Sequence, residues 1–353
     1  MTRSLHLHLH LLTLLVASLL VPAAPAQEAP LPATARAESA AQPFLWRVQR
    51  GATAGFLYGT IHLPDPRATA IPSDVQRAFE SSDAFYAEIE TTPAAELSVQ
   101  SAALLPGGER LDRIVGPEVW ARVKARLATA GLPPAFAEGM TRMKPWALGA
   151  TLPMLRYLPE MSAGKPPLDK MLFQRAQRAG KTVGGLETPA EQIAAFEVFT
   201  RAEHVRMLED SLDELDRYDT DGRDLMEETL TAWLSGDEAR LLTLLDSGFG
   251  SDPALKERAA AALLWRRNRR LADRIDQRMT GEQVHFFAVG ALHMPDAPTQ
   301  RSTKPVDGAV AAEGERAGAQ AIPTFEVAPG QPAPKLGLVT LLRARGFSVE
   351  RVR

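Results

Sequence analysis

Short apolar segments separated by turn residues occur near both ends of the chain. Their β-branched and aromatic side chains, bounded by Gly, Pro and Asp, are typical of strands. The segments predicted as strands are 44–49, 55–62, 84–90, 182–188 and 282–293. An Arg-Gly-Ala-Thr-Ala-Gly turn joins the first two, and a last short strand is predicted after Gly346.

The middle of the chain follows the helical period instead. The predicted helical segments are 73–83, 116–131, 140–157, 167–181, 189–245 and 252–279. Ser73 and Asp252 suit N-caps, and Pro145 and Pro153 predict breaks in the third segment. Strands that alternate with helices at both ends, around a helical middle region, predict an α/β fold with a central, mostly parallel sheet flanked by helices.

The N-terminus has the pattern of an export signal. Arg3 supplies a positive start, residues 11–21 an apolar stretch, and residues 24–26 small side chains at a cleavage position. We therefore expect residues 1–26 to be a signal peptide and the mature protein to be periplasmic or secreted. The apolar stretch is too short for a stable membrane span, so none is expected after cleavage.

The mature chain is predicted to be one domain, residues 44–353, preceded by a flexible linker at 27–43. A Pro-, Gly- and Ala-rich stretch at about 297–334 is predicted to be a flexible insertion. The absence of cysteine excludes a disulfide framework and a thiol nucleophile. The net charge of -3 gives no electrostatic reason to expect a nucleic acid partner.

One phrase occurs twice: Gly-x-x-His followed by an apolar residue, Pro and Asp. It begins at Gly59 and includes His62 and Asp65, and it begins again at Gly290 and includes His293 and Asp296. A lone histidine after a strand is more commonly a capping or hydrogen-bonding residue, whereas two in matching phrases favour a functional site. Since ligands of parallel α/β sheets bind beyond the carboxyl ends of the strands, we expect adjacent strands to bring both histidines to one site.

Glutamates end two further predicted strands. Glu88 and Glu90 end one, on the same face by alternation, and Glu187 ends another. Two imidazoles and one carboxylate form an open set of ligands for a divalent metal such as Mn, Zn or Co. Glu90 and Glu187 equally suit the caps of the helices that follow them.

The remaining histidines are given other roles. His6, His8 and His10 lie in the predicted signal peptide and would be removed with it. His285 lies within a strand and is interpreted as structural, while His204 lies in a charged helix and is interpreted as a surface residue. The chain contains no His-Glu-x-x-His, Gly-x-Ser-x-Gly or P-loop motif, which disfavours zincins, α/β-hydrolases and NTPases of the usual kinds.

Several short motifs follow one another in a recognisable order. They are LYGTIHLP, AEIE, MKPW, GLETPAEQ, RRN, AVGALHMPD and LLRARGFSVERV. The ordered set resembles the TraB/GumN/Tiki family along nearly the whole mature chain, above all its exported bacterial GumN-like branch. The resemblance implies a metal-dependent protease and a central sheet built from two related halves. The insertion at 297–334 departs from the family, whose members run almost directly from the second histidine motif into the closing helix.

The resemblance also implies which residues form the site. Carried over by motif, these are His62, Glu88 and His293 for the metal, with Glu187, Arg267 and Asn268 at further recurrent positions.

The first functional hypothesis is therefore a metal-dependent hydrolase, most of all a peptidase acting on a peptide or protein. The two motif histidines and Glu88 would bind the metal, which polarises a carbonyl and lowers the pKa of a bound water. Glu187 or Glu90 would accept the proton of that water, and Arg267 would stabilise the developing oxyanion.

Two alternatives use the same residues. One is a non-enzymatic envelope accessory protein, for example in polysaccharide production or export, in which the histidines orient a binding pocket. The other is a metal-dependent esterase acting on a substrate that is not a peptide.

Overall fold

The computed structural model describes residues 43–246, 250–297 and 335–352. The predicted signal peptide, the linker before Pro43 and nearly all of the predicted insertion lie outside these residues. The described residues include the two Gly-x-x-His phrases and every candidate site residue named above.

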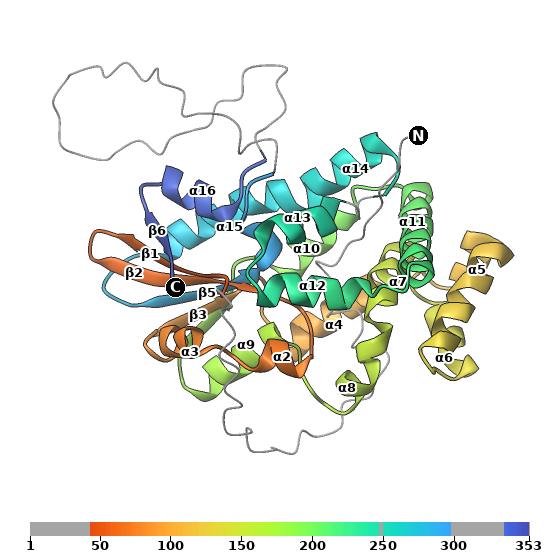
Figure 1. Ribbon diagram of the computed structural model, residues 1–353, viewed down its shortest axis with the longest axis horizontal. Coiled ribbons are helices and arrows are strands. Elements are labelled where there is room, and N and C mark those ends of the chain that lie inside the picture. The colour runs from red at the N-terminus through yellow and green to blue at the C-terminus, as the bar shows by residue number, and fades with distance from the viewer. Residues whose placement is uncertain (1–42, 247–249, 298–334, 353) are drawn as a thin grey trace.

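A single sheet joins the two ends of the chain. Its six strands have the order β4-β3-β5-β2-β1-β6 (Figure 1). Their bounds are β1 Leu45–Arg50, β2 Thr53–Thr60, β3 Ala84–Ala87, β4 Thr182–Gly185, β5 His285–Gly290 and β6 Ser348–Arg351. The four strands β4, β3, β5 and β2 are parallel, while β1 and β6 add antiparallel pairs at one edge. The expected α/β fold is confirmed, with the parallel part confined to those four strands.

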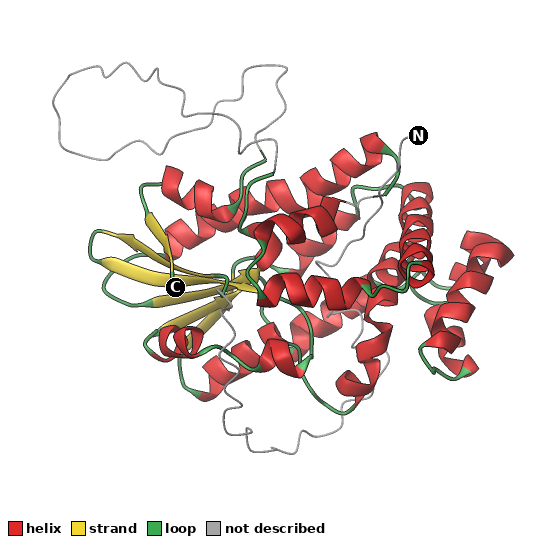
Figure 2. Cartoon of the chain, viewed as in Figure 1, coloured by secondary structure: helices red, strands yellow, loops and turns green. Residues whose placement is uncertain are grey.

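Helices make up the middle of the chain and surround the sheet (Figure 2). The α-helices are α2 Pro66–Thr69, α3 Ser73–Glu80, α4 Pro93–Ala102, α5 Leu111–Thr129, α6 Pro134–Met140, α7 Pro145–Thr151, α8 Leu158–Ser162, α9 Leu168–Arg178, α10 Pro189–Phe196, α11 Arg201–Thr220, α12 Leu225–Leu234, α13 Glu238–Asp246, α14 Pro253–Ala260, α15 Arg266–Arg278 and α16 Leu338–Ala344. Two 3-10 turns, η3 Leu152–Tyr157 and η5 Ala291–His293, and one π turn, η4 Ala261–Trp265, complete the described elements.

Proline and capping residues set where these helices begin. Asp252 accepts hydrogen bonds from two backbone N–H groups of α14, as predicted. Gly116, at a φ of 80°, breaks α5 so that Pro117 starts its second half. The prediction for Ser73 is wrong: it is the first helical residue, and Pro72 holds the N-cap position without a side-chain bond.

Alternating side chains give the sheet two apolar faces. Phe85 and Phe286 pair in register and stack with ring centroids 5.8 Å apart on the face that meets Phe173 of α9. On the other face Tyr86 stacks on Phe287. Helices α3 and α9 lie below the sheet in Figure 1, and α15 and α16 lie above it. The carboxyl ends of the parallel strands point toward the helical middle region.

Within the described ranges, the two histidines outside the repeated phrase are both buried. His285 stacks beside both Tyr86 and Phe287, with centroids 6.1 and 5.9 Å away. His204 is only 6% exposed, and its Nε2 lies 3.0 Å from the carbonyl oxygen of Phe196. The surface interpretation of His204 is therefore wrong, because its ring binds the end of α10 rather than facing solvent.

Candidate functional site

The four parallel strands each deliver one ionisable side chain to the same edge of the sheet. Glu187 follows β4, Glu88 follows β3, His293 follows β5 and His62 follows β2, which is the order of the strands across the sheet. The adjacency of β2 and β5 is the arrangement predicted from the repeated phrase. Because parallel strands share a direction, their carboxyl ends form one rim, and the site lies on it.

The two histidines are held by different partners. His62 Nδ1 lies 3.1 Å from Asp169 Oδ1, at the first turn of α9. His293 is fully buried, and its Nδ1 contacts the side-chain oxygen of Asn268 on α15. In both rings the Nδ1 contact leaves Nε2 to face the site, which is the arrangement by which outer residues orient histidine ligands.

The different partners and surroundings also give the two histidine rings different pKa values. Burial lowers the pKa of His62, but the adjacent carboxylate of Asp169 outweighs burial and raises it to about 9. Burial dominates at His293 and, despite Glu88 nearby, lowers its pKa to about 4. His62 therefore favours the charged form and His293 the neutral form.

Glu88 is the carboxylate at the centre of the group. Its Oε1 accepts a 2.6 Å hydrogen bond from the Gly290 N–H and lies 3.9 Å from His293 Nε2. Its Oε2 accepts a 2.6 Å bond from Arg267 Nη2 and a 3.3 Å bond from Gln192. Burial raises its pKa, but Arg267 and the two histidines overcome that effect and lower it to about 2, so Glu88 is ionised at neutral pH.

Arg267 reaches this group because of an irregular helix. The π turn η4 lies between α14 and α15, directly before Arg266 and Arg267. Arg267 Nη1 donates a 3.1 Å hydrogen bond to the carbonyl oxygen of Leu263 within that turn. The side chain is 2% exposed and its charge is balanced by Glu88 and Glu187. A π turn of this kind occurs frequently at functional sites.

Glu187 binds two arginines. Its Oε2 accepts bonds of 2.9 and 2.6 Å from Nε and Nη2 of Arg267, and its Oε1 accepts a 3.0 Å bond from Nε of Arg270. A carboxylate engaged at both oxygens is well suited to hold a guanidinium in place. The proton-accepting role stays a prediction, and this geometry favours an orienting role for Glu187. Glu187 does not cap α10. Thr188 and Glu191 form a capping box at the start of that helix.

The two glycines of the repeated phrase face opposite sides of the sheet. In the β2–β5 register Gly59 pairs with Val289 and Thr60 pairs with Gly290, so the two phrases are offset by one residue. A one-residue offset turns the side-chain positions to opposite faces. A Cβ on Gly59 would lie 2.8 Å from the Cβ of Phe44, within the packing of the hairpin.

A Cβ on Gly290 would instead enter the site. It would lie 2.9 Å from Glu88 Oε1 and 3.7 Å from both His62 Nε2 and a ring carbon of His293. The three expected metal ligands thus surround the space that glycine leaves open. Glycine is needed here for that space, whereas the N–H bond to Glu88 could be made by any residue except proline.

The donor atoms fit a divalent metal in kind. The Nε2 atoms of His62 and His293 are buried and have no hydrogen-bond partner among the described residues, and both lie beside the Glu88 carboxylate. Unpartnered buried imidazole nitrogens next to a carboxylate are a suitable donor set for Mn, Zn or Co. As the side chains stand, however, no three His, Asp or Glu residues within the described ranges are close enough together to hold a metal.

Some residues of the site were not expected from the sequence, and one expected residue, Glu90, lies outside the site. Asp169 and Gln192 gave no signal, because each looks like an ordinary polar residue in the first turn of a helix. Arg270 lies two residues after the Arg-Arg-Asn motif and was not among the expected site residues. Glu90 is exposed and makes none of the contacts described for the site, so the geometry does not support it as the second carboxylate.

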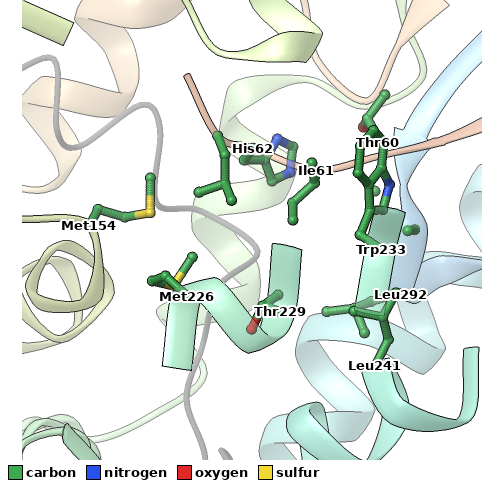
Figure 3. Close-up of a pocket in the computed structure, with 12 residues that line it drawn as sticks. Thr60, Ile61, His62, Met154, Met226, Thr229, Trp233, Leu241 and Leu292 are labelled. Carbon is green, nitrogen blue, oxygen red and sulfur yellow. The ribbon is translucent and has the colours of Figure 1, made fainter. Parts of the chain in front are cut away.

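A cavity adjoins the site on the side of His62 (Figure 3). Its walls come from the ends of β2 and β5 and from η3, α12 and α13. The lining residues are Thr60, Ile61, His62, Leu63, Met154, Met226, Thr229, Trp233, Leu241, Gly290, Ala291 and Leu292. His62 and Gly290 belong to both the cavity and the site, so the two are continuous.

The class of protein is defined by its sheet and its site. The sheet is mixed, and its four parallel strands lead to two Gly-x-x-His histidines and two glutamates. The chain belongs to the TraB/PrgY/gumN family, whose model matches residues 44–299. The family resemblance noted in the sequence is thereby confirmed.

Individual relatives carry a more specific description. The chain is 26% identical to Metalloprotease TIKI1 of Danio rerio over 291 residues, which is 71% of this chain and 58% of the relative. It is 31% identical to Metalloprotease TIKI2 of Danio rerio over 173 residues (42% and 33%), and 28% identical to Metalloprotease TIKI1 of Homo sapiens over 200 residues (49% and 39%). The chain thus spans less than two thirds of the length of these relatives. No solved structure matches it.

None of the helices in the described part of the chain combines the length and the apolarity that a membrane crossing requires.

Proposed function

We propose that this protein is a metal-dependent hydrolase, most of all a peptidase, that acts in the periplasm or after secretion. The observation that carries the proposal is the pair of unpartnered histidine Nε2 atoms beside the ionised Glu88. Membership of a family whose relatives are named metalloproteases supports it. The export pattern of residues 1–26 supports the location.

His62 and His293 would hold the metal through Nε2, and Glu88 through Oε1, the oxygen nearer His293. The metal, Mn, Zn or Co, supplies a Lewis acid that polarises a substrate carbonyl and lowers the pKa of water. The chain fixes the direction of each ligand: Asp169 and Asn268 orient the two rings, and the Gly290 N–H and Arg267 orient Glu88.

Arg267 would act on the substrate oxygen. Its buried positive charge lies beside Glu88, where water is excluded and an electrostatic interaction is stronger than in solvent. Glu187 and the carbonyl of Leu263 prevent the guanidinium from turning away. Glu187 would chiefly hold Arg267 in place, and to accept a proton from water, the role predicted from the sequence, it would have to release one of its arginine bonds.

The substrate that fits this chemistry is a peptide or protein. The test is the metal content and peptide cleavage of the purified mature chain, loaded separately with Mn, Zn and Co. We expect the wild-type chain to bind metal and cleave a peptide library, and His62→Ala and His293→Ala to lose the metal and the cleavage together.

His285→Phe is the matched control, because it removes a buried histidine while keeping an aromatic ring in the stack with Tyr86 and Phe287. Its metal content should equal that of the wild type. Unchanged metal and cleavage in His62→Ala would contradict the site assignment. A metal-binding chain that cleaves no peptide would contradict the peptidase part alone.

A second candidate function is a non-enzymatic envelope protein that binds its ligand in the same pocket. The cavity that adjoins His62 favours it, since a concave, mostly apolar pocket can hold a ligand without any turnover. Under that alternative, neither metal nor turnover would be found in the purified chain. The metal analysis therefore separates the two functions directly.

A further inference from the structure

The cavity beside the site is almost wholly apolar. Among the described residues that line it, His62 alone is ionisable, and its charge is paired with Asp169, which lies outside the lining. Leu241 and Leu292 lie at one end and Met154 and Met226 at the other (Figure 3). Taking a charged group into such a surface without a partner costs several kcal/mol, so the cavity selects against charge.

One wall of the cavity is rigid. The indole Nε1 of Trp233 donates a 2.8 Å hydrogen bond to the carbonyl oxygen of Gly59, and its ring meets Tyr58 edge-on at 6.4 Å. Thr229 donates its hydroxyl to the carbonyl of Leu225 within α12, so this hydroxyl is already satisfied without a ligand. The polar atoms of Trp233 and Thr229 are thus engaged with the protein.

The opposite wall is adaptable. Met154 and Met226 have unbranched thioether chains that adjust to irregular shapes. The cavity measures about 480 Å³ with its open mouth included. Because that value includes open solvent, the enclosed part is much smaller and is closer to the size of one side chain than to that of a whole peptide.

We propose that this cavity is the specificity subsite of the enzyme and takes one large uncharged side chain of the substrate, of the Leu, Met or Phe class. That the cavity receives a substrate rests on the proposed function. That it adjoins the site rests on His62 and Gly290, which belong to both. A side chain seated between Trp233 and Met226 would bring the attached peptide backbone toward His62, which lines the same cavity. Met226, Thr229 and Trp233 are the residues that determine the preference.

The test measures binding without requiring turnover. N-acetyl amino acid amides bearing Leu, Met, Phe, Lys or Asp side chains are titrated against the purified chain, as isolated and after chelation, by saturation-transfer NMR. We expect the Leu, Met and Phe compounds to bind at least about tenfold more tightly than the Lys and Asp compounds, consistent with the discrimination that apolar pockets achieve. Equal binding of all five would overturn the proposal.

Two substitutions locate the binding. Thr229→Phe fills the cavity and should weaken binding of the Leu compound at least about tenfold. Thr231→Phe is its matched control, since Thr231 is exposed on the same helix two residues away, and it should bind as the wild type does. Met226→Ala provides a second route if the filled variant folds poorly, because it enlarges the cavity and should shift the preference from Leu toward a naphthylalanine compound.

Failure of the subsite and failure of the enzyme give different results. Selective binding that Thr229→Phe removes, in a chain that cleaves nothing, supports the subsite and contradicts the peptidase. Cleavage of peptides regardless of side chain, with no selective binding, does the reverse. Tighter binding of an N-octanoyl amide than of every amino acid compound would overturn the side-chain assignment in favour of an acyl chain.

Discussion

The first and second Gly-x-x-His phrases have the same residues at their key positions and different surroundings. The first runs on from β2 without a helical turn, and its His62 keeps a partly exposed ring against the charged Asp169. The second folds into the 3-10 turn η5, and its His293 is fully buried against the neutral Asn268. A short motif therefore identifies which side chains meet, while the rest of the chain decides their charge and environment.

The glycines and aspartates of the two phrases differ in the same way. Gly59 allows close packing against Phe44, whereas Gly290 leaves open the space between the expected ligands. Asp65 caps the short helix α2, whereas Asp296 accepts hydrogen bonds from the Gly337 N–H and the Thr340 hydroxyl. Gly59 and Asp65 thus serve mainly local structure, whereas Gly290 opens the site and Asp296 binds a distant segment of the chain.

We expect the largest difference between the two phrases when each glycine is replaced by alanine. Gly59→Ala places a Cβ 2.8 Å from Phe44 Cβ and 3.1 Å from the backbone of Ala291, so we expect the unfolding free energy to fall by about 1–3 kcal/mol in urea titrations. Gly290→Ala should retain most of that stability and lose metal binding, because its Cβ occupies the ligand space. Equal effects of both variants on metal content would contradict the comparison.

Exchanging the histidine partners tests the next largest difference. Asp169→Asn gives His62 a neutral partner like that of His293, and metal affinity should fall about 10–100-fold, as for other outer-residue changes. Asn268→Asp should chiefly lower stability, because Asn268 also donates a 2.9 Å bond to the carbonyl of Leu336 and a carboxylate cannot donate it. Metal titration and thermal melting of both variants would show whether affinity and stability separate.

Removal of each aspartate should have a smaller effect. Asp65→Ala removes a helix cap and an ion pair with Arg67, and should cost about 1 kcal/mol with the site unchanged. Asp296→Ala should cost a similar amount, but the loss of its bonds to Gly337 and Thr340 should also speed hydrogen exchange in α16. Faster exchange of α16 in Asp65→Ala would be against this assignment.

The dependence of stability on pH in the chelated protein compares the charges of the two rings. The raised pKa of His62, about 9, contributes stability that is complete below about pH 6.5 and is lost as the pH rises through 9. The lowered pKa of His293, about 4, has the opposite sign: stability falls as the pH drops from about 6.5 toward 4, because the unfolded chain binds the proton first. NMR titration of the two rings, assigned with His62→Gln and His293→Gln, should give one charged and one neutral ring at pH 7.5.

The sequence was sufficient to predict the strand ends and the meeting of His62 and His293, whereas the choice of Glu88 over Glu90 and Glu187 came from the family resemblance. Each of these side chains follows a short apolar strand, and parallel strands share a carboxyl rim, so their ends meet. The offset of one residue between the phrases had no signal, because hydrophobic strands buried on both faces show no preferred register.

The partners of these residues were harder to predict. Asp169 looks like a residue that interacts with the dipole of its own helix, so nothing in its surroundings suggested His62. His204 was misassigned because its partner is a backbone carbonyl, which carries no residue-type signal. The π turn at Ala261–Trp265 lies in a run of apolar residues that equally fits a regular helix.

That π turn fixes the direction in which its helix presents Arg267 and Asn268. A π turn contains one more residue than the α-helical path it interrupts, and each α-helical residue advances the side chains by about 100°. If the same residues formed an uninterrupted α-helix, α15 would be rotated by about that angle relative to α14, and Arg267 and Asn268 would leave Glu187 and His293. Such a helix would be more regular in itself, yet the four strand ends would then lack the guanidinium that neutralises their carboxylates.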